Sequence, residues 1–180
     1  WIASGELGIL LWAGFLEAVG GFGASIIVSI ICGFLAGFYK GFREYIVPLN
    51  GLFMAIPPIA WAPMMLIIFG IGYTTIVVVI FISAVNPMIL TMMEGILTIQ
   101  GGEVRAARAL GAKKFQLFWY IYLPASLPFV TAALRIGFSQ AWRALVAAEM
   151  IGATQGLGWM VSMGGEIGNQ RQVMLVIVLI

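Results

Sequence analysis

The sequence contains very few charged residues. Only 9% of its 180 residues are Asp, Glu, Lys or Arg, against roughly 25% in an average soluble domain. Apolar residues make up 62%, and the mean hydropathy is +1.08. A soluble protein of this size cannot cover its surface with so few charges, so the composition indicates an integral membrane protein. The net charge of +2 is too small to indicate a nucleic acid partner.

Asp and His are absent altogether. Their absence excludes a His-rich metal site and a Ser-His-Asp triad, so we predict no metal site and no catalytic residues. Cys32 is the single cysteine and lies in an apolar run, so we expect it to pack rather than to form a disulfide. The sequence also has no G-x-x-x-x-G-K-[ST] motif, so we expect it to bind no nucleotide.

Long uncharged stretches predict helices that cross a membrane. Residues 18–39 predict the first span, and residues 45–93 have room for two more, with a glycine-containing turn at 69–75. A fourth span is predicted over about 126–150, and the apolar run 173–180 is expected to begin a fifth that is cut off at its end. These stretches are too long for barrel strands and lack strict alternation. The predicted fold class is therefore an all-α polytopic membrane protein.

Six of the nine positively charged residues fall in two loops, at 40–50 and 95–124. Two predicted spans separate these loops, so both lie on one side of the membrane. An excess of Lys and Arg predicts that this side is cytoplasmic. The segment before the first span then lies outside, where residues 9–19 can form an interfacial helix.

Glycines and prolines inside the spans predict how the helices pack. Gly33, Gly37 and Gly41 recur at intervals of four, a spacing that lets helix backbones approach closely. Pro57 and Pro58 predict a kink or break in the second span.

The loop at 95–124 has the pattern of a helix–glycine–helix elbow. Gly101 and Gly102 interrupt the chain, residues 103–110 have helical composition, and Gly111 is a helix stop at which a left-handed backbone is expected. A second short helix is predicted over 113–122, before the fourth span. Composition alone leaves two interpretations open: a docking elbow, or a loop that packs only against its own spans and lipid headgroups.

The spacing within this loop resembles the EAA loop of ABC-importer permeases of the binding-protein-dependent type. The matching pattern is Arg105-Ala106-Ala107, three residues, Gly111, nine residues, Ile121, one residue and Leu123-Pro124. The first position is usually Glu in that family and is Arg105 here, with Glu103 two residues earlier. Other segments resemble the nitrate, sulfonate and taurine branch, namely Ile56-Pro57-Pro58, Phe69-Gly70-Ile71-Gly72, Leu134-Arg135-Ile136, Val146-Ala147-Ala148-Glu149-Met150 and Gly156-Leu157-Gly158.

This resemblance implies a type I ABC importer fold, with residues 1–180 as one transmembrane permease domain and a coupling loop at about 101–124. It implies that the loop docks on a separate ATP-binding subunit through Glu103, Arg105, Ala106, Ala107, Leu110, Gly111, Phe115 and Phe118.

The resemblance also implies the partners. They are two ATP-binding subunits that carry ATP and Mg, a second and identical permease subunit, and an external solute-binding protein. The chain itself binds no cofactor and lies as a multi-pass protein in the lipid bilayer of a bacterial inner membrane. Its implied substrate is a small anion such as nitrate, a sulfonate or taurine.

Polar and helix-breaking residues inside spans are candidates for the substrate pathway. They are Pro58, Trp61, Asn86, Gln140, Arg143 and Glu149. Asn86 can instead bond a neighbouring helix, and Glu149 can simply mark the membrane interface. Arg143 is offset by six residues from Glu149, so the two do not pair within one helix. An unpaired Arg at that depth predicts a water-filled path and an anionic ligand, with an interhelical ion pair as the competing explanation.

A second functional class also fits a helical membrane protein. It is a secondary transporter or channel driven by an ion gradient. Co-purification distinguishes the two, because an importer permease brings an ATPase subunit with it in mild detergent.

The charge asymmetry yields a prediction about orientation. In a Cys32→Ala background, a cysteine at Lys113 is expected to react only with reagents that reach the cytoplasm. Cysteines at Tyr73 and Gln155 are expected to react from outside. Labelling of all three positions from one side, measured in intact cells and inverted vesicles, would contradict the topology.

Overall fold

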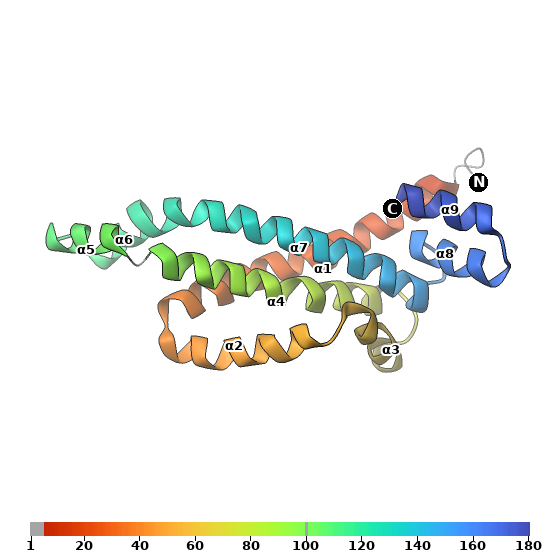
Figure 1. The fold of residues 1–180 in the computed structure, drawn as a ribbon, viewed down its shortest axis with the longest axis horizontal. Helices are drawn as coiled ribbons and strands as arrows, with labels where there is room; N and C mark the ends of the chain where they lie inside the picture. Colours follow the sequence, from red (N-terminus) through yellow and green to blue (C-terminus); the bar gives the residue numbers. More distant parts are fainter. Residues whose placement is uncertain (1–5, 100) are drawn as a thin grey trace.

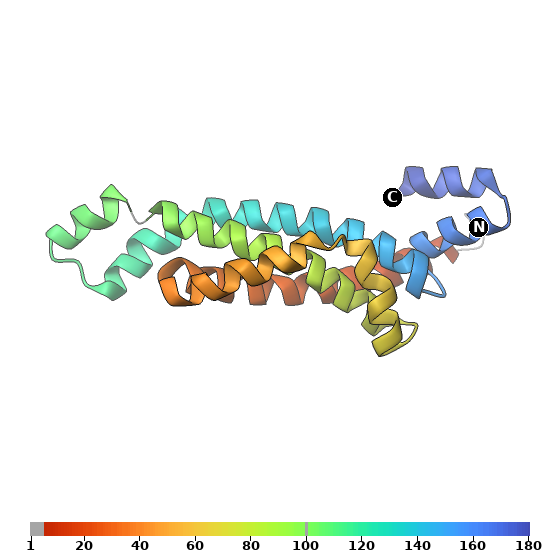
Figure 2. The same ribbon diagram turned by 60° about the horizontal axis from the view of Figure 1, so that its bottom comes forward.

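The computed structural model describes residues 6–99 and 101–180, and every regular element in those residues is a helix (Figure 1). In chain order the elements are α1 (Glu6–Phe38), α2 (Lys40–Ala55), α3 (Pro58–Phe69), α4 (Tyr73–Ile99), α5 (Gly102–Ala109), α6 (Lys114–Leu117), the π-helix η1 (Phe118–Tyr122), α7 (Leu123–Gly152), α8 (Leu157–Glu166) and α9 (Gln170–Leu179). Figures 1 and 2 show α1, α4 and α7 alongside one another, with α5 and α6 at one end and α8 and α9 at the other.

Within the described residues, three segments are long and apolar enough to cross a membrane: Gly14–Phe38, Tyr73–Ile99 and Lys114–Gly152. A fourth crossing is added if α2 and α3, which are bent by 92° from one another, count as one broken span. The predicted helical membrane architecture is therefore confirmed. The run 173–180, expected to begin a fifth span, falls largely in α9.

The N-terminal segment differs from the prediction. Residues 9–19 belong to α1 and continue directly into the first span, so they do not form a separate interfacial helix. No proline interrupts the segment, and a glycine inside a helix costs only about 1 kcal/mol relative to alanine, which packing readily offsets. Glu17, whose charge marked the edge of the predicted span, lies inside the helix.

Glycines bring α1 into close contact with α4. A Cβ atom built on Gly37 would lie 2.5 Å from the Cβ of Ile96, and one on Gly33 would overlap Met92. Only glycine lets the two backbones approach this closely. The predicted packing role is confirmed for these two glycines, whereas Gly41 lies in α2 with nothing within 4 Å of its Cβ position.

Two prolines end α2 and turn the chain. In a continuous helix, the carbonyls of Phe53 and Met54 would accept hydrogen bonds from residues 57 and 58, but proline has no N–H. The helix therefore ends at Ala55, Ile56 takes an extended conformation, and α3 begins at Pro58 in a new direction. The predicted break in the second span is confirmed.

The helix that follows the elbow is longer than predicted. The sequence predicted a short helix over 113–122 and a separate span from about 126, but one helical run extends from Lys114 to Gly152. The N–H of Leu123 bonds to the carbonyl of Phe118, five residues back, so one turn widens into the π-helix η1. Pro124 then falls in the first turn of α7, where its missing N–H is tolerated.

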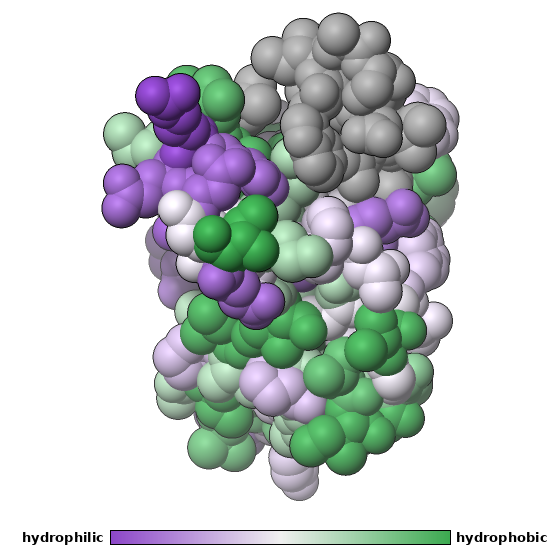
Figure 3. All heavy atoms as spheres, turned by 90° about the vertical axis from the view of Figure 1, so that its right-hand side faces the viewer, coloured by the Kyte–Doolittle hydropathy of each residue, from purple (hydrophilic) through white to green (hydrophobic). Residues whose placement is uncertain are grey.

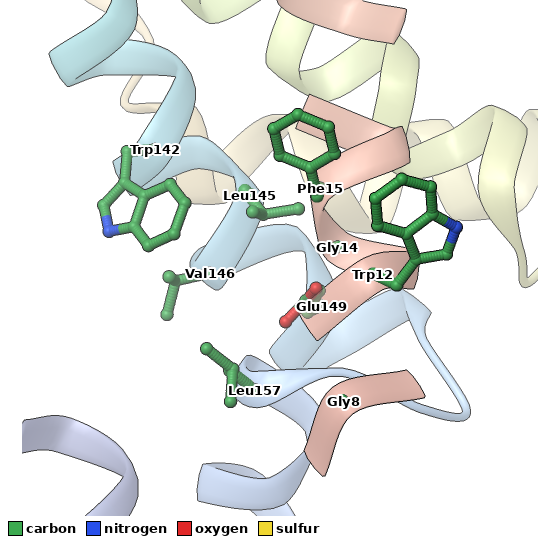
Figure 4. Close-up of a pocket in the computed structure, with 9 residues that line it drawn as sticks. All are labelled: Gly8, Trp12, Gly14, Phe15, Trp142, Leu145, Val146, Glu149 and Leu157. Carbon is green, nitrogen blue, oxygen red and sulfur yellow. The ribbon is translucent and has the colours of Figure 1, made fainter. Parts of the chain in front are cut away.

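Glu149, near the end of α7, joins this helix to α8. The sequence left open whether it simply marks the interface, but the structure buries it to 2% exposure. Its Oε2 accepts a hydrogen bond of 2.7 Å from the N–H of Gly158. This is the first turn of α8, where free N–H groups and the helix dipole favour a carboxylate. Figure 4 shows the carboxylate between α1 and the start of α8.

Three glycines allow the close contact around Glu149. A Cβ atom on Gly156 would lie 2.5 Å from Glu149 Cδ, and one on Gly14 of α1 would lie 2.9 Å from Glu149 Oε1. A Cβ atom on Gly158 would overlap the backbone carbonyl of Val146. Residues 146–150 and 156–158, two of the segments that resemble the nitrate, sulfonate and taurine branch, therefore contact each other.

The same end of the molecule has two surfaces of different character. Figure 3 shows hydrophilic side chains over α9 and the turn before it, and hydrophobic ones around α3 below. The exposed residues of α3 include Met64, Ile67 and Ile68, as expected for a surface that faces lipid.

Because a backbone carbonyl cannot move aside as a side chain can, Gly158→Ala is expected to destabilise the protein by about 1–3 kcal/mol. Gly165→Ala is the matched control in the same helix, where nothing lies within 4 Å, and it is expected to be neutral or to stabilise by about 0.5–1 kcal/mol. The measurement is the thermal unfolding midpoint of the protein in detergent. Equal midpoints for the two variants would contradict the contact.

Candidate functional site

The elbow turns at Gly111. Its N–H donates to the carbonyl of Arg108 at 3.0 Å, and the N–H of Ala112 donates to the carbonyl of Ala107 at 3.0 Å. These two bonds form a Schellman motif, which needs a left-handed residue just after the helix. Gly111 has φ of +85°, so the predicted left-handed turn is confirmed.

The inner side of the elbow has a small apolar core. Val104 and Leu117 are each 3% exposed and Tyr122 is 6% exposed, and together they join α5 to the helix that follows. Two predicted docking residues, Ala107 and Phe118, pack on this cluster. The structure therefore places these two on the inner side of the elbow.

The other predicted docking residues lie on the outer side. Leu110 is 89% exposed and Phe115 is 73% exposed. Arg105, Ala106 and Gly111 are also exposed. The side chain of Glu103 lies outside the described part of the structure. The elbow thus presents two apolar side chains on a rigid turn.

Two exposed aromatic residues of this segment, Trp119 and Tyr120, were not among the predicted docking residues. Tyr120 is 79% exposed, and with Leu110, Gly111 and Gln116 it lines a hollow of about 380 Å³ between α5 and the helix that follows. Residues 118–122 form a π-helix, which changes the angle between successive side chains from that of an α-helix.

Four of the six predicted pathway residues line one cavity of about 80 Å³ at the α2–α3 break. They come from three helices: Pro58 and Trp61 from α3, Asn86 from α4, and Gln140 from α7. The structure therefore brings together residues more than 80 positions apart in the chain.

The fixed polar groups of this cavity bond to their own helix. The Nδ2 of Asn86 donates to the carbonyl of Ile82 at 2.7 Å, and the Oγ of Ser83 donates to the carbonyl of Val79 at 2.7 Å. Asn86 therefore does not bond a neighbouring helix, the alternative left open by the sequence. The side chain of Gln140 makes no hydrogen bond to any described residue.

Arg143 lies on the exposed face of α7, outside the set that lines this cavity. Its Nε donates to the carbonyl of Ser139 and its Nη2 to the Oγ of Ser139, each at 3.0 Å. No carboxylate among residues 6–99 and 101–180 forms an ion pair with it. The competing interhelical ion pair is thus not found in this part of the chain. Gln140 is three residues earlier, so the two side chains are neighbours on α7.

Glu149 lies at a different cavity. This space of about 450 Å³ is bounded by α1, α7 and the start of α8, and its other lining residues are mostly apolar, such as Trp12, Phe15 and Trp142 (Figure 4). The structure therefore separates Glu149 from the four residues at the α2–α3 break.

Asn50 was also missed from the sequence. It lies in α2 one turn before the break, is 2% exposed, and its Nδ2 has no partner among the described residues. The available signal was an Asn in an uncharged stretch, the same signal that selected Asn86.

Comparisons with known proteins identify the family of the chain. Residues 25–180 match the family described as "binding-protein-dependent transport system inner membrane component". The chain is 38% identical over 143 residues to the taurine transport system permease protein TauC of Escherichia coli (strain K12), covering 79% of this chain and 52% of that protein. It is 32% identical over 155 residues to the nitrate import permease protein NrtB of Synechocystis sp., covering 86% of this chain and 56% of that protein. The chain thus spans about half the length of these curated relatives.

The fold matches a chain of the MetNI methionine ABC transporter in an inward-facing conformation. The TM-score is 0.80 at 23% identity, covering 96% of this chain and 87% of that chain. At this identity the likeness shows the fold alone, and it confirms the predicted type I ABC importer transmembrane fold. With the family match over most of its length, the chain belongs to the inner membrane components of binding-protein-dependent transport systems, the permease subunits of ABC importers.

Proposed function

We propose that the chain forms the membrane-spanning part of an ATP-driven importer of a bacterial inner membrane, and that its substrate path opens alternately to the two sides. In this proposal two separate ATP-binding subunits hold ATP and Mg, and this chain binds no cofactor. A second, identical permease subunit completes the path. An external solute-binding protein delivers the substrate.

The observation that carries this proposal is the exposed apolar surface of the elbow. Leu110 and Phe115 are 89% and 73% exposed, at the end of the molecule where α5 and α6 extend past the long helices (Figure 2). Covering apolar surface is favourable by about 25 cal/mol per Å². Exposed Arg105 and Arg108 flank this surface and suit carboxylates on a partner. An ATP-binding subunit on the cytoplasmic side fits both features.

The helices on either side of the elbow support a coupling role. The elbow follows α4 in the chain, and the helix from Lys114 onward continues without a break into α7. Force applied to the elbow is therefore transmitted to the helix that carries Gln140 and Arg143. A movement of the ATP-binding subunits then changes the cavity at the α2–α3 break.

The proposed substrate is a small anion such as nitrate, a sulfonate or taurine. Arg143 supports an anionic ligand because it lies within the Lys114–Gly152 span and pairs with no carboxylate among the described residues. The relatives named for taurine and nitrate are consistent with this class. The alternative of a transporter or channel driven by an ion gradient gains no support from family membership.

Gly111→Val is expected to uncouple the complex. A left-handed backbone costs an L-residue about 1–2 kcal/mol, and a β-branched side chain suffers most, so the turn opens and shifts the docking surface. The variant should insert normally, yet lose at least tenfold in substrate-stimulated uptake into vesicles. Gly111→Asn should be milder, because Asn tolerates this conformation.

Gly41→Val is the matched control for this change. Both glycines have nothing within 4 Å of the Cβ position, but Gly41 is helical and does not have positive φ. Its uptake should stay within twofold of wild type. Normal coupled uptake by Gly111→Val, with insertion verified by surface labelling, would exclude the elbow as the coupling surface.

Arg143→Ala is expected to lower anion uptake at least tenfold while the complex still assembles. The side chain is exposed and bonds only to Ser139, so its removal leaves no buried charge unpaired. Assembly is measured by co-purification of the ATP-binding subunit, and transport by uptake into vesicles. Arg135→Ala, an exposed arginine earlier in the same helix, is the control and should transport normally. Loss of assembly would show instead that Arg143 holds the subunits together.

A further inference from the structure

The cavity at the α2–α3 break offers several hydrogen-bond acceptors. Ser83 uses its O–H and Asn86 uses one of its two N–H bonds on the α4 backbone, so the oxygens of both side chains remain for a ligand. Asn86 is 7% exposed, and its Oδ1 accepts no hydrogen bond from any described residue. The orientation of this amide is fixed, because its nitrogen must face the carbonyl of Ile82.

The broken helix adds further acceptors. Phe53 and Met54 line the cavity, and their carbonyls have no helical partner because the residues four ahead are Pro57 and Pro58. They belong to the last turn of α2, where the negative end of the helix dipole favours a positive charge. On the other side of the break, Pro58 brings no N–H to the first turn of α3.

The aromatic residues in the lining favour the same kind of ligand. Trp61 and Phe53 both line the cavity, and their rings stack with centroids 5.4 Å apart. An aromatic face attracts a cation, and indole does so most strongly. No charged side chain lines the cavity. An anion would therefore find only uncharged donors here, the amides of Gln140 and Asn86 and the indole N–H of Trp61.

We propose that this cavity binds the ammonium group of a small zwitterionic solute while Arg143 holds the solute's anionic group. The inference rests on the proposed import function and narrows its substrate class. A volume of about 80 Å³ takes one end of such a solute rather than all of it. Gln140 of the cavity and Arg143 are three residues apart on α7, which places their Cβ atoms about 5–6 Å apart. A solute with its two charges on a short carbon chain spans this interval.

The test compares two solutes of matched shape on the complex of permease and ATP-binding subunits, without the solute-binding protein. Taurine carries an ammonium and a sulfonate, and propane-1-sulfonate replaces the ammonium with a methyl group. Dissociation constants come from titration of the thermal unfolding midpoint. Taurine is expected to bind at least tenfold more tightly. Asn86→Leu should abolish this preference and leave the affinity for propane-1-sulfonate unchanged.

Thr91→Val is the matched control variant. Thr91 lies in the same helix and also bonds a carbonyl four residues back, but it does not line the cavity. It should keep the preference for taurine. Ser83→Ala is a second test variant in case Asn86→Leu fails to fold, and it should weaken taurine binding at least threefold.

Equal binding of the two sulfonates, or a preference for taurine that survives in the Asn86 and Ser83 variants, would overturn the proposal.

A monovalent metal ion presents the same chemistry as an ammonium group. If sodium chloride stabilises the complex through Asn86 and taurine does not, a metal ion is the occupant and the zwitterion proposal is wrong. Uptake into vesicles with the solute-binding protein present distinguishes failure of this inference from failure of the proposed import function. ATP-dependent uptake without the taurine preference overturns this inference alone. Absence of ATP-dependent uptake overturns the proposed function.

Discussion

A polar backbone group at membrane depth must find its partner inside the protein, because hydrocarbon offers none. The three long segments meet this requirement as helices, and α1 approaches α4 closely where glycines remove the side chains between them. The α2–α3 break is the exception, since its prolines leave the carbonyls of Phe53 and Met54 without helical partners. Irregular backbone at this depth is tolerated where it lines a polar cavity. The break and the cavity thus follow from the same constraint.

The run from Lys114 to Gly152 connects the parts of the molecule that have distinct roles. It contains 39 residues, which at 1.5 Å per residue is about 58 Å. The elbow lies at one end, Gln140 and Arg143 lie further along, and Glu149 fixes α8 at the other end. Because the π-helix η1 lets the helix continue past Pro124, no flexible joint separates the elbow from Gln140 and Arg143, the residues of α7 proposed to line the pathway. A rigid helix transmits displacement better than a jointed one.

The sequence predicted local features, such as helix breaks and turns, more reliably than the packing of the helices against one another. The break at Pro57 and the left-handed turn at Gly111 were predictable because each depends on the chemistry of one or two residues. The cavity was not, because Trp61, Asn86 and Gln140 meet only when three helices pack. The sequence suggested that a separate short helix ends before Pro124, but a single π-helical turn lets one helix continue past this proline.

Glu149 shows the limit of such reasoning most directly. The sequence placed it among the candidate pathway residues and left an interface position open as the alternative, and nothing in the local sequence shows that the first turn of α8 folds back onto it. The contact depends on glycines seven and nine residues later: Gly156 leaves space for the carboxylate, and Gly158 leaves space for the carbonyl of Val146. Three-dimensional packing therefore decided the role of this residue.

Two charged residues of α7 differ in how their charge is used: Glu149 bonds to the protein itself, and Arg143 keeps N–H groups free for a ligand. The Glu149 carboxylate is buried and accepts a backbone N–H, so its charge is used in holding α8. Arg143 has five N–H bonds in its guanidinium, of which two are used on Ser139, so three remain for a ligand. The cavity near it carries dipoles rather than full charges, which holds a cationic group weakly enough to release it. A transport path needs such moderate binding, because a solute held by opposite full charges at both ends would leave too slowly.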